Sequence, residues 1–265
     1  QAPLYNLLQI PIDIPIAELK DLDNKFNTPA GYFGAYALNP YWVLANNKTS
    51  NIVDRFNTNI TLNYKPVKWL TFTGRFGSDN YTDSRFQKWR KITYTNWDTE
   101  KKLVGRYSED IYRVGQYNAD IIVQGMHTFK EKYMINVLVG GNMNVNNTKN
   151  TYAQTAGLAV DDLYTFENSQ DRPTLANIVY RKNLASVYYD INFGYKNFLF
   201  LGTSGRNDWT STLAKGKNSY FYAGANVSLV LSELIKADPM ALSYWKIRAS
   251  FAQVGKDADP YSLRN

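Results

Sequence analysis

The chain offers few side chains of the kinds that carry out covalent or metal chemistry. It has 265 residues and no cysteine, which excludes disulfides, thiolate metal sites and cysteine nucleophiles. Its single histidine, His127, lies on the apolar side of a predicted strand near a turn, and metal sites need several ligands. No HExxH motif is present, and Gly216-Lys217 lacks the strand and glycine that precede the lysine of a phosphate-binding loop. We therefore predict no catalytic site, no enzymatic activity and no cofactor.

Two acidic pairs are the remaining candidates for a metal site. Asp161 is followed directly by Asp162, and Asp257 is separated from Asp259 by one residue. Such pairs can bind Ca²⁺ weakly, but neither has the glycine and the terminal glutamate of an EF-hand loop. Solvated carboxylates in polar loops are the commoner reason for this spacing. The sequence therefore predicts no metal site.

Aromatic side chains are the only candidates for a substrate-binding site. Flat rings suit sugar faces, because C–H groups stack on π systems at little entropic cost. We assign substrate binding to four rings in predicted outward-facing loops: Trp89, Tyr94, Trp97 and Trp209. An alternative stays open, in which these rings anchor loops or belong to an aromatic belt at a membrane surface.

The elements that must position these rings are strands. In residues 185–195 the odd positions from Val187 to Phe193 are apolar, and most positions between them are polar or small. A period of two is typical of a strand with one dry and one wet face. The turn Lys196-Asn197 leads into residues 198–208, where both parities begin with apolar residues, so the facing of that strand stays open.

Six further segments show alternation and complete a count of about eight strands: residues 55–65, 70–79, 117–129, 135–145, 221–231 and 245–251. Short turns near Pro66, Lys130 and Lys196 alternate with long polar connections, which we read as loops at residues 81–110, 146–181 and 209–218. Residues 232–243 are expected to form a short helical turn. Residues 1–50 contain five prolines and read as a long, partly ordered loop with a helical turn at residues 16–22. Alternating short and long connections are typical of an outer-membrane barrel.

The wet face of these strands is rich in amide and hydroxyl side chains. Lysine and glutamate usually dominate a soluble protein's surface, so a water-filled lumen explains this composition better. The predicted lumen-facing residues are Asn57, Asn59, Asn63, Asn118, Asp120, Gln124, Asn136, Asn142, Asp190, Asn192 and Asn226.

Composition bounds the possible partners. The net charge is +7, but lysines and arginines are scattered singly, which argues against nucleic-acid binding.

No run approaches the roughly 18 apolar residues of a spanning helix, so a membrane would have to be crossed by strands of a closed barrel. The aromatic content of 15% fits interfacial belts in a lipid bilayer. A soluble β-rich carbohydrate-binding protein and a passive porin or adhesin barrel remain alternatives.

Four stretches carry a resemblance to a known family. They are residues 39–44 (NPYWVL), residues 55–79 (RFNTNITLNYKPVKWLTFTGRFGSD), residues 188–222 (YYDINFGYKNFLFLGTSGRNDWTSTLAKGKNSYFY) and residues 244–261 (YWKIRASFAQVGKDADPY). The chain resembles the SusC/RagA-type TonB-dependent outer-membrane transporters of Bacteroidota. That family builds a barrel of about 22 strands with a plugged lumen. By this resemblance, residues 1–265 form part of the barrel domain, with residues 1–50 as an extracellular loop, residues 51–265 as barrel strands and loops, and the plug domain absent.

The resemblance also implies a function and partners. Members of this family import oligosaccharides or oligopeptides across the bacterial outer membrane, driven by the proton gradient through TonB, ExbB and ExbD. A surface lipoprotein of the SusD type covers the barrel as a lid. We expect the long loops to face this lid and the short turns to lie in the periplasm, with the remaining strands and the plug supplied from outside this sequence.

Overall fold

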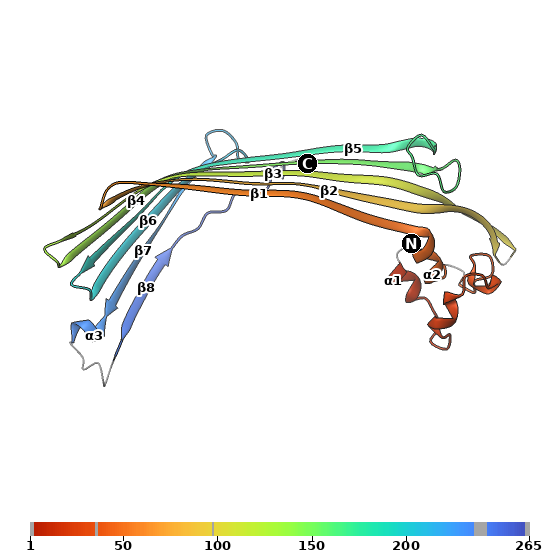
Figure 1. Ribbon diagram of the computed structural model, residues 1–265, viewed down its shortest axis with the longest axis horizontal. Coiled ribbons are helices and arrows are strands. Elements are labelled where there is room, and N and C mark those ends of the chain that lie inside the picture. The colour runs from red at the N-terminus through yellow and green to blue at the C-terminus, as the bar shows by residue number, and fades with distance from the viewer. Residues whose placement is uncertain (1–2, 35–36, 97, 236–242, 263–265) are drawn as a thin grey trace. The chain divides into compact units, whose positions relative to one another are not determined.

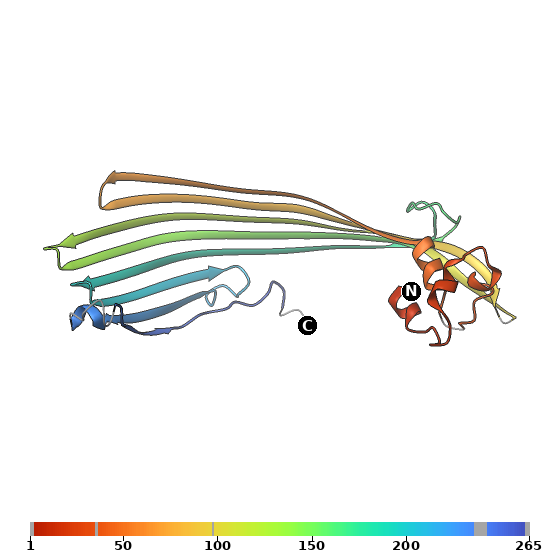
Figure 2. The same cartoon turned by 60° about the horizontal axis from the view of Figure 1, so that its bottom comes forward.

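A computed structural model describes residues 3–34, 37–96, 98–235 and 243–262. Its dominant feature is one antiparallel sheet of eight strands, which pair in sequence order from β1 to β8 (Figures 1 and 2). The strands are β1 (Asn47–Val67), β2 (Leu70–Asn96), β3 (Thr99–Phe129), β4 (Tyr133–Leu158), β5 (Ser169–Tyr195), β6 (Leu199–Thr210), β7 (Ser219–Val230) and β8 (Lys246–Ala252). The predicted fold class, an all-β antiparallel sheet suited to part of a barrel wall, is confirmed. Among the described residues, no helix has both the length and the apolar character needed to cross a membrane.

The chain divides into two compact units. The first contains Gln1–Asp54, Thr82–Arg113 and Lys149–Ile178, and the second contains Arg55–Tyr81, Val114–Thr148 and Val179–Asn265. Strands β1 to β5 run through both units, whereas β6, β7 and β8 belong to the second unit alone.

Two hairpins of the second unit close with left-handed turn residues. Lys130 and Glu131 have φ values of 49° and 57°, and Lys196 and Asn197 have φ values of 45° and 61°. Two consecutive positive φ values define the type I′ turn, whose twist matches that of the flanking strands. Both predicted short turns are confirmed at these positions, and the turn near Pro66 connects β1 to β2 through residues 68–69.

The register of β5 to β8 separates the side chains of the second unit onto two faces. Directly paired residues on neighbouring antiparallel strands point to the same side of the sheet. One such row runs through Asn192, Gly202, Asn226 and Ser250. The next row runs through apolar residues: Phe193, Leu201, Val227 and Ala249. One face is therefore polar and the other apolar.

This register also settles the facing of residues 198–208, which the sequence left open. Leu201 pairs with Phe193 and Val227, so the odd positions of β6 lie on the apolar face. Phe200 lies on the polar face, where the ammonium of Lys246 is 5.5 Å from the centroid of its ring. The segment is apolar at both parities because Phe200, at an even position, places its ring among polar groups, while Leu201 lies on the apolar face.

The N-terminal segment of the first unit is folded, so its prediction as a partly ordered loop was wrong. It forms α1 (Pro3–Leu7), η1 (Ile16–Lys20), η2 (Lys25–Asn27) and α2 (Pro40–Asn46), of which η1 confirms the expected turn. Leu38, Trp42 and Val43 make a small core against strand residues far away in sequence, among them Ile92 and Tyr94. Because this core depends on contacts distant in sequence, local patterning does not reveal it.

One buried asparagine connects the pieces of this N-terminal segment. The side-chain amide of Asn39 donates to the carbonyls of Leu19 and Asn27 at 2.8 and 3.0 Å. Its carbonyl oxygen accepts from the backbone N–H of Tyr41 at 2.9 Å and so caps the start of α2. Such capping satisfies a donor that a helix start leaves unpaired.

The prediction of long loops at residues 81–110 and 146–181 was also wrong. Strand β2 continues to Asn96 and β3 begins at Thr99, while β4 continues to Leu158 and β5 begins at Ser169. These extensions are strands because their backbones pair with each other, but neither face carries a regular apolar stripe. A period of two therefore cannot be read there. Of the third predicted loop, residues 209–218, the first two residues belong to β6. A helical turn was expected at residues 232–243; α3 (Leu231–Leu234) overlaps the start of that range, and residues 236–242 lie outside the described residues.

The positive φ of Asn197 predicts opposite effects for two substitutions. Asn197→Gly should leave the free energy of unfolding unchanged or raise it slightly, because glycine adopts this conformation without strain. Asn197→Val should lower it by about 1–2 kcal/mol, the cost of a left-handed residue that is not glycine. Urea unfolding in detergent measures both, and equal midpoints for the two variants would contradict the turn geometry.

Candidate functional site

The polar face of the second unit carries a dense network of charged and aromatic side chains. The guanidinium of Arg206 donates to Asp208 and to the hydroxyl of Ser186, each at 2.7 Å. The hydroxyl of Tyr222 donates to the second oxygen of Asp208 at 2.5 Å. The side chain of Asp208 is only 6% exposed, so this carboxylate is compensated within the protein and is not free for a ligand.

A second network on this face contains several predicted lumen residues. The amide of Asn142 donates to Asn118 and to Asp120, both at 2.9 Å. The Tyr188 hydroxyl reaches Asp120 at 3.5 Å. Tyr188 pairs with Arg206, so these residues share one face of the sheet.

The other predicted lumen residues make similar short contacts. Gln124 donates to Asn136 at 3.0 Å, Thr73 donates to Asn63 at 2.8 Å, and Asn59 donates to Asn57 at 3.3 Å. Asn192 donates to Asp190, and Asn192 lies in the same row as Asn226. The structure thus joins most of these residues by side-chain hydrogen bonds and places Asn226 in one row with Asn192, while their exposure to a water-filled lumen stays a prediction.

Glycine at position 140 allows an aromatic ring to lie directly on the sheet. A Cβ atom at Gly140 would stand 2.4 Å from Cζ of Tyr188, which is closer than any real contact. The ring of Tyr188 therefore occupies the space that a side chain at position 140 would fill, and it is also 5.7 Å from the guanidinium carbon of Arg206.

Residues 253–261, here called the crossing segment, follow β8 and contact β7, β6 and β5 in turn. Gly255 lies against the rings of Tyr220 and Tyr222. Asp257 accepts from Lys182 at 2.6 Å and from Thr210 at 2.7 Å. Further along, the rings of Tyr261 and Tyr180 are 6.0 Å apart. The partner residues in β5, β6 and β7 occupy even positions, so the crossing segment lies on the polar face.

The ion pair of the crossing segment changes the acidity of Asp257. Burial alone would raise the pKa of this carboxyl, but hydrogen bonds from Lys182, Thr210 and Thr212 outweigh it, so the pKa lies below its ordinary value. Asp257 is thus charged at neutral pH and contributes stability there. The sequence offered Asp257 and Asp259 as an acidic pair, and the structure gives Asp257 a role in holding a segment in place.

The four predicted binding rings do not form one site. Tyr94 packs against the small core of the first unit, and Trp209 lies near the end of β6 on the apolar face, paired with Ala185 and Ser219. Trp97 lies outside the described residues. Trp89 lines a pocket.

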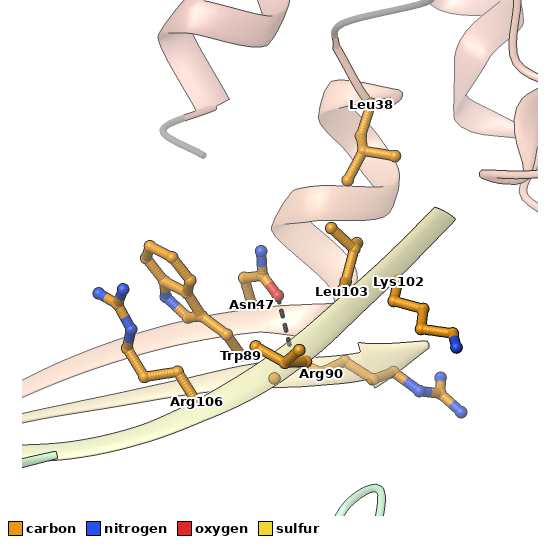
Figure 3. A pocket seen from close by; sticks show the side chains of 9 residues that line it. Leu38, Asn47, Trp89, Arg90, Lys102, Leu103 and Arg106 are labelled. Carbon is orange, nitrogen blue, oxygen red and sulfur yellow. Dashed lines mark hydrogen bonds between the residues drawn. The ribbon is translucent and has the colours of Figure 1, made fainter. Parts of the chain in front are cut away.

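This pocket, here called the Trp89 pocket, belongs to the first unit and has a volume of about 240 Å³. Its lining includes Leu38, Asn47, Trp89, Arg90, Leu103 and Arg106. Figure 3 shows the indole of Trp89 and the guanidinium of Arg106 at one end of the group and the ammonium of Lys102 at the other. The backbone N–H of Arg90 donates to the side chain of Asn47 at 3.2 Å, which ties β1 to β2 beside the pocket.

An aromatic cluster that sequence reasoning missed also lies in the first unit. The ring of Tyr107 is 5.0 Å from that of Phe166 and 6.5 Å from that of Tyr164. Burial raises the pKa of Tyr107 to about 12, and its hydrogen bond to Glu109 adds to the shift. The phenol is therefore neutral and donates at any physiological pH. No spacing rule joins these rings, because Tyr107 lies in β3 whereas Tyr164 and Phe166 lie in the connection between β4 and β5, more than fifty residues away in sequence.

The structure gives the remaining chemistry candidates ordinary roles. Asp161 accepts from Arg90 and from the backbone N–H of Lys91, at 3.0 and 2.9 Å. The ring of His127 lies 4.3 Å from that of Phe129. Within the described ranges there is no group of three or more His, Cys, Asp or Glu residues that could hold a metal ion.

Comparison with known proteins finds similarity at the level of fold. No protein-family model matches the chain, and no curated protein matches it. Solved structures do match, among them chains of the RagAB peptide transporter (17% identity, TM-score 0.71) and of the RagAB peptide importer in its "closed-closed" (17%, 0.70) and "open-open" (18%, 0.72) states. The matches cover 83%, 82% and 83% of this chain but only 25%, 24% and 24% of those chains. The chain therefore shares a fold with about a quarter of each of these proteins.

The contacts of Asp257 predict how the crossing segment opens. Asp257→Ala should speed hydrogen exchange in residues 253–261 about tenfold, because hydrogen bonds to a charged group are lost. Asp259→Ala is the matched control and should change little, since Asp259 is exposed. The pKa of Asp257 is lower in the folded than in the unfolded state. The hydrogen bonds of its carboxylate therefore stabilise the crossing segment fully above the unfolded-state pKa of about 3.9, and this stabilisation is lost as the pH falls through the folded-state pKa. Equal exchange in both variants would contradict the assigned role.

Proposed function

We propose that this chain forms part of the wall of a SusC/RagA-type outer-membrane transporter. The observation that carries the proposal is the two-faced register of the second unit, in which rows of amide and hydroxyl groups alternate with apolar rows. A barrel wall needs this arrangement because one face touches lipid and the other faces a polar lumen. The fold shared with chains of the RagAB peptide transporter adds support.

The apolar face favours a membrane over a soluble location. Val227, Ile247 and Phe251 are 40%, 52% and 67% exposed. A soluble carbohydrate-binding protein would cover such a face with a second layer of protein, and no described segment of the second unit covers these three side chains. Strands β6 and β7 have 12 residues each, close to the roughly 9–11 residues that a tilted strand needs to cross a bilayer.

The proposed substrates are oligopeptides or oligosaccharides, taken up without chemical change. The matched structures are described as a peptide transporter and a peptide importer, which supports peptides as one class. As in the family that the sequence resembles, a SusD-type surface lipoprotein and the TonB–ExbB–ExbD machinery would be partners. We propose no enzymatic activity. A passive porin is the alternative, and it would transport without the proton gradient.

Uptake by whole cells tests this proposal. Cells that produce the protein should take up labelled oligopeptides or oligosaccharides, and dissipation of the proton gradient should stop uptake. Deletion of the gene is the control. Uptake that persists without the gradient would favour the porin, and uptake unaffected by the deletion would contradict a transport function.

Adjacent residues in β7 predict opposite responses to a charge. Val227→Arg should destabilise the folded protein by roughly 2–4 kcal/mol if Val227 faces the middle of the bilayer. Asn226→Arg is the matched control and should be tolerated, because Asn226 lies on the polar face beside Gly202. Folding into lipid vesicles, followed by heat-modifiable migration in gels, measures both variants. Similar folding yields would argue against the lipid-facing assignment.

A further inference from the structure

Arg106 is a cation that the protein positions but does not neutralise. Its guanidinium carbon lies 4.3 Å from the centroid of the Trp89 ring (Figure 3). Stacking of this kind is favourable and leaves the N–H edge of the guanidinium open. Among the described residues, no carboxylate forms an ion pair with Arg106, and its side chain makes no hydrogen bond.

The other cations that line the Trp89 pocket have partners. Arg90 binds Asp161 at 3.0 Å and the side chain of Asn46 at 2.8 Å, and Lys102 binds Glu100 at 2.8 Å. The lining itself contains no carboxylate. The pocket therefore has one uncompensated positive charge, located on a group with five donors in a fixed plane.

The backbone next to Arg106 is held in an unusual conformation that fixes its position. Gly105 has a φ of +72°, which glycine adopts without strain. A Cβ atom there would lie 2.8 Å from Cδ1 of Leu158 and 3.0 Å from the backbone nitrogen of Lys91. The close approach of β2 and β4 residues to this glycine determines where the neighbouring arginine leaves the strand.

We infer that the Trp89 pocket binds a carboxylate group of a ligand through Arg106. A guanidinium matches a carboxylate with two parallel N–H···O hydrogen bonds, and such charge-assisted pairs are the stronger kind. The indole of Trp89 stacks on the guanidinium, and the same pocket is lined by the apolar side chains of Leu38 and Leu103. This inference rests on the proposed transport function and narrows its substrates to acidic ones, either peptides with acidic side chains or oligosaccharides with uronic acids.

Binding to the purified protein in detergent tests the inference directly. The probes are two matched pairs: a pentapeptide with blocked termini and a central Glu against its Gln counterpart, and a trisaccharide with one glucuronate against its glucose counterpart. Isothermal titration should show about tenfold or more tighter binding of the acidic member in at least one pair. The pair that shows the preference identifies the source of the carboxylate.

Substitutions then assign the preference to Arg106. Arg106→Gln should abolish it, and Arg106→Lys should retain only part of it, because an ammonium lacks the planar fork. Arg113→Gln, which removes an exposed arginine of the same strand, should leave it intact. Heat-modifiable migration confirms that each variant is folded, and Arg106→Lys serves as the test if Arg106→Gln does not fold.

Three outcomes would overturn the inference: no preference in either pair with the wild-type protein, a preference that Arg106→Gln retains, or an equal loss in Arg113→Gln. Parallel uptake of the neutral probes by cells separates this inference from the proposed function. Normal uptake of neutral probes with no acidic preference removes the carboxylate site alone. A carboxylate preference in titration without any cellular uptake removes the transport function and keeps the site.

Discussion

The structure depends on one constraint, the pairing of every strand with its neighbours along an antiparallel ladder. Pairing satisfies backbone N–H and C=O groups and forces alternate side chains onto opposite faces. The register of the strands then decides which side chains share a face. Asn192, Asn226 and Ser250 lie in one row because their strands pair in a fixed register. A shift of one residue would move every apolar side chain to the polar face. The turns at Lys130 and Lys196, with their positive φ values, prevent such a shift.

Sequence reasoning succeeded where a physical asymmetry left a local trace. All eight strands were predicted, seven from the alternation of apolar and polar residues and the eighth, residues 198–208, from the short turn that precedes it. It failed where no face is apolar, as in the extensions of β2 to Asn96 and β5 from Ser169, which hydrogen bonding maintains without an apolar stripe. It failed again at the N-terminal segment, whose core of Leu38, Trp42 and Val43 is completed by residues about fifty positions away such as Ile92. The facing of Phe200 needed the partner strands, because the segment itself is apolar at both parities.

For the candidate site, too, the sequence predicted some features and missed others. The amide-rich residues were recognised as one set, and their mutual hydrogen bonds, such as those between Asn142 and Asp120, agree with a shared face. Of the four aromatic rings singled out, Trp89 lines a pocket, and the interest of that pocket depends on Arg106, a residue 17 positions along the chain on the neighbouring strand. Composition indicates which residue types are present, whereas strand pairing decides which of them meet. The crossing segment with Asp257 is a further case, since its partners belong to β5 and β6.

The most direct test of the central claim is the accessibility of single cysteines along β7 in lipid vesicles. The chain has no cysteine of its own, so each introduced thiol reports without background. The account predicts an alternation of period two: spin labels at positions 225, 227 and 229 should be relaxed by oxygen in the lipid, and labels at positions 224, 226 and 228 by a water-soluble nickel chelate. Equal accessibility at both sets of positions, or burial of the first set in protein, would contradict a wall between lipid and water.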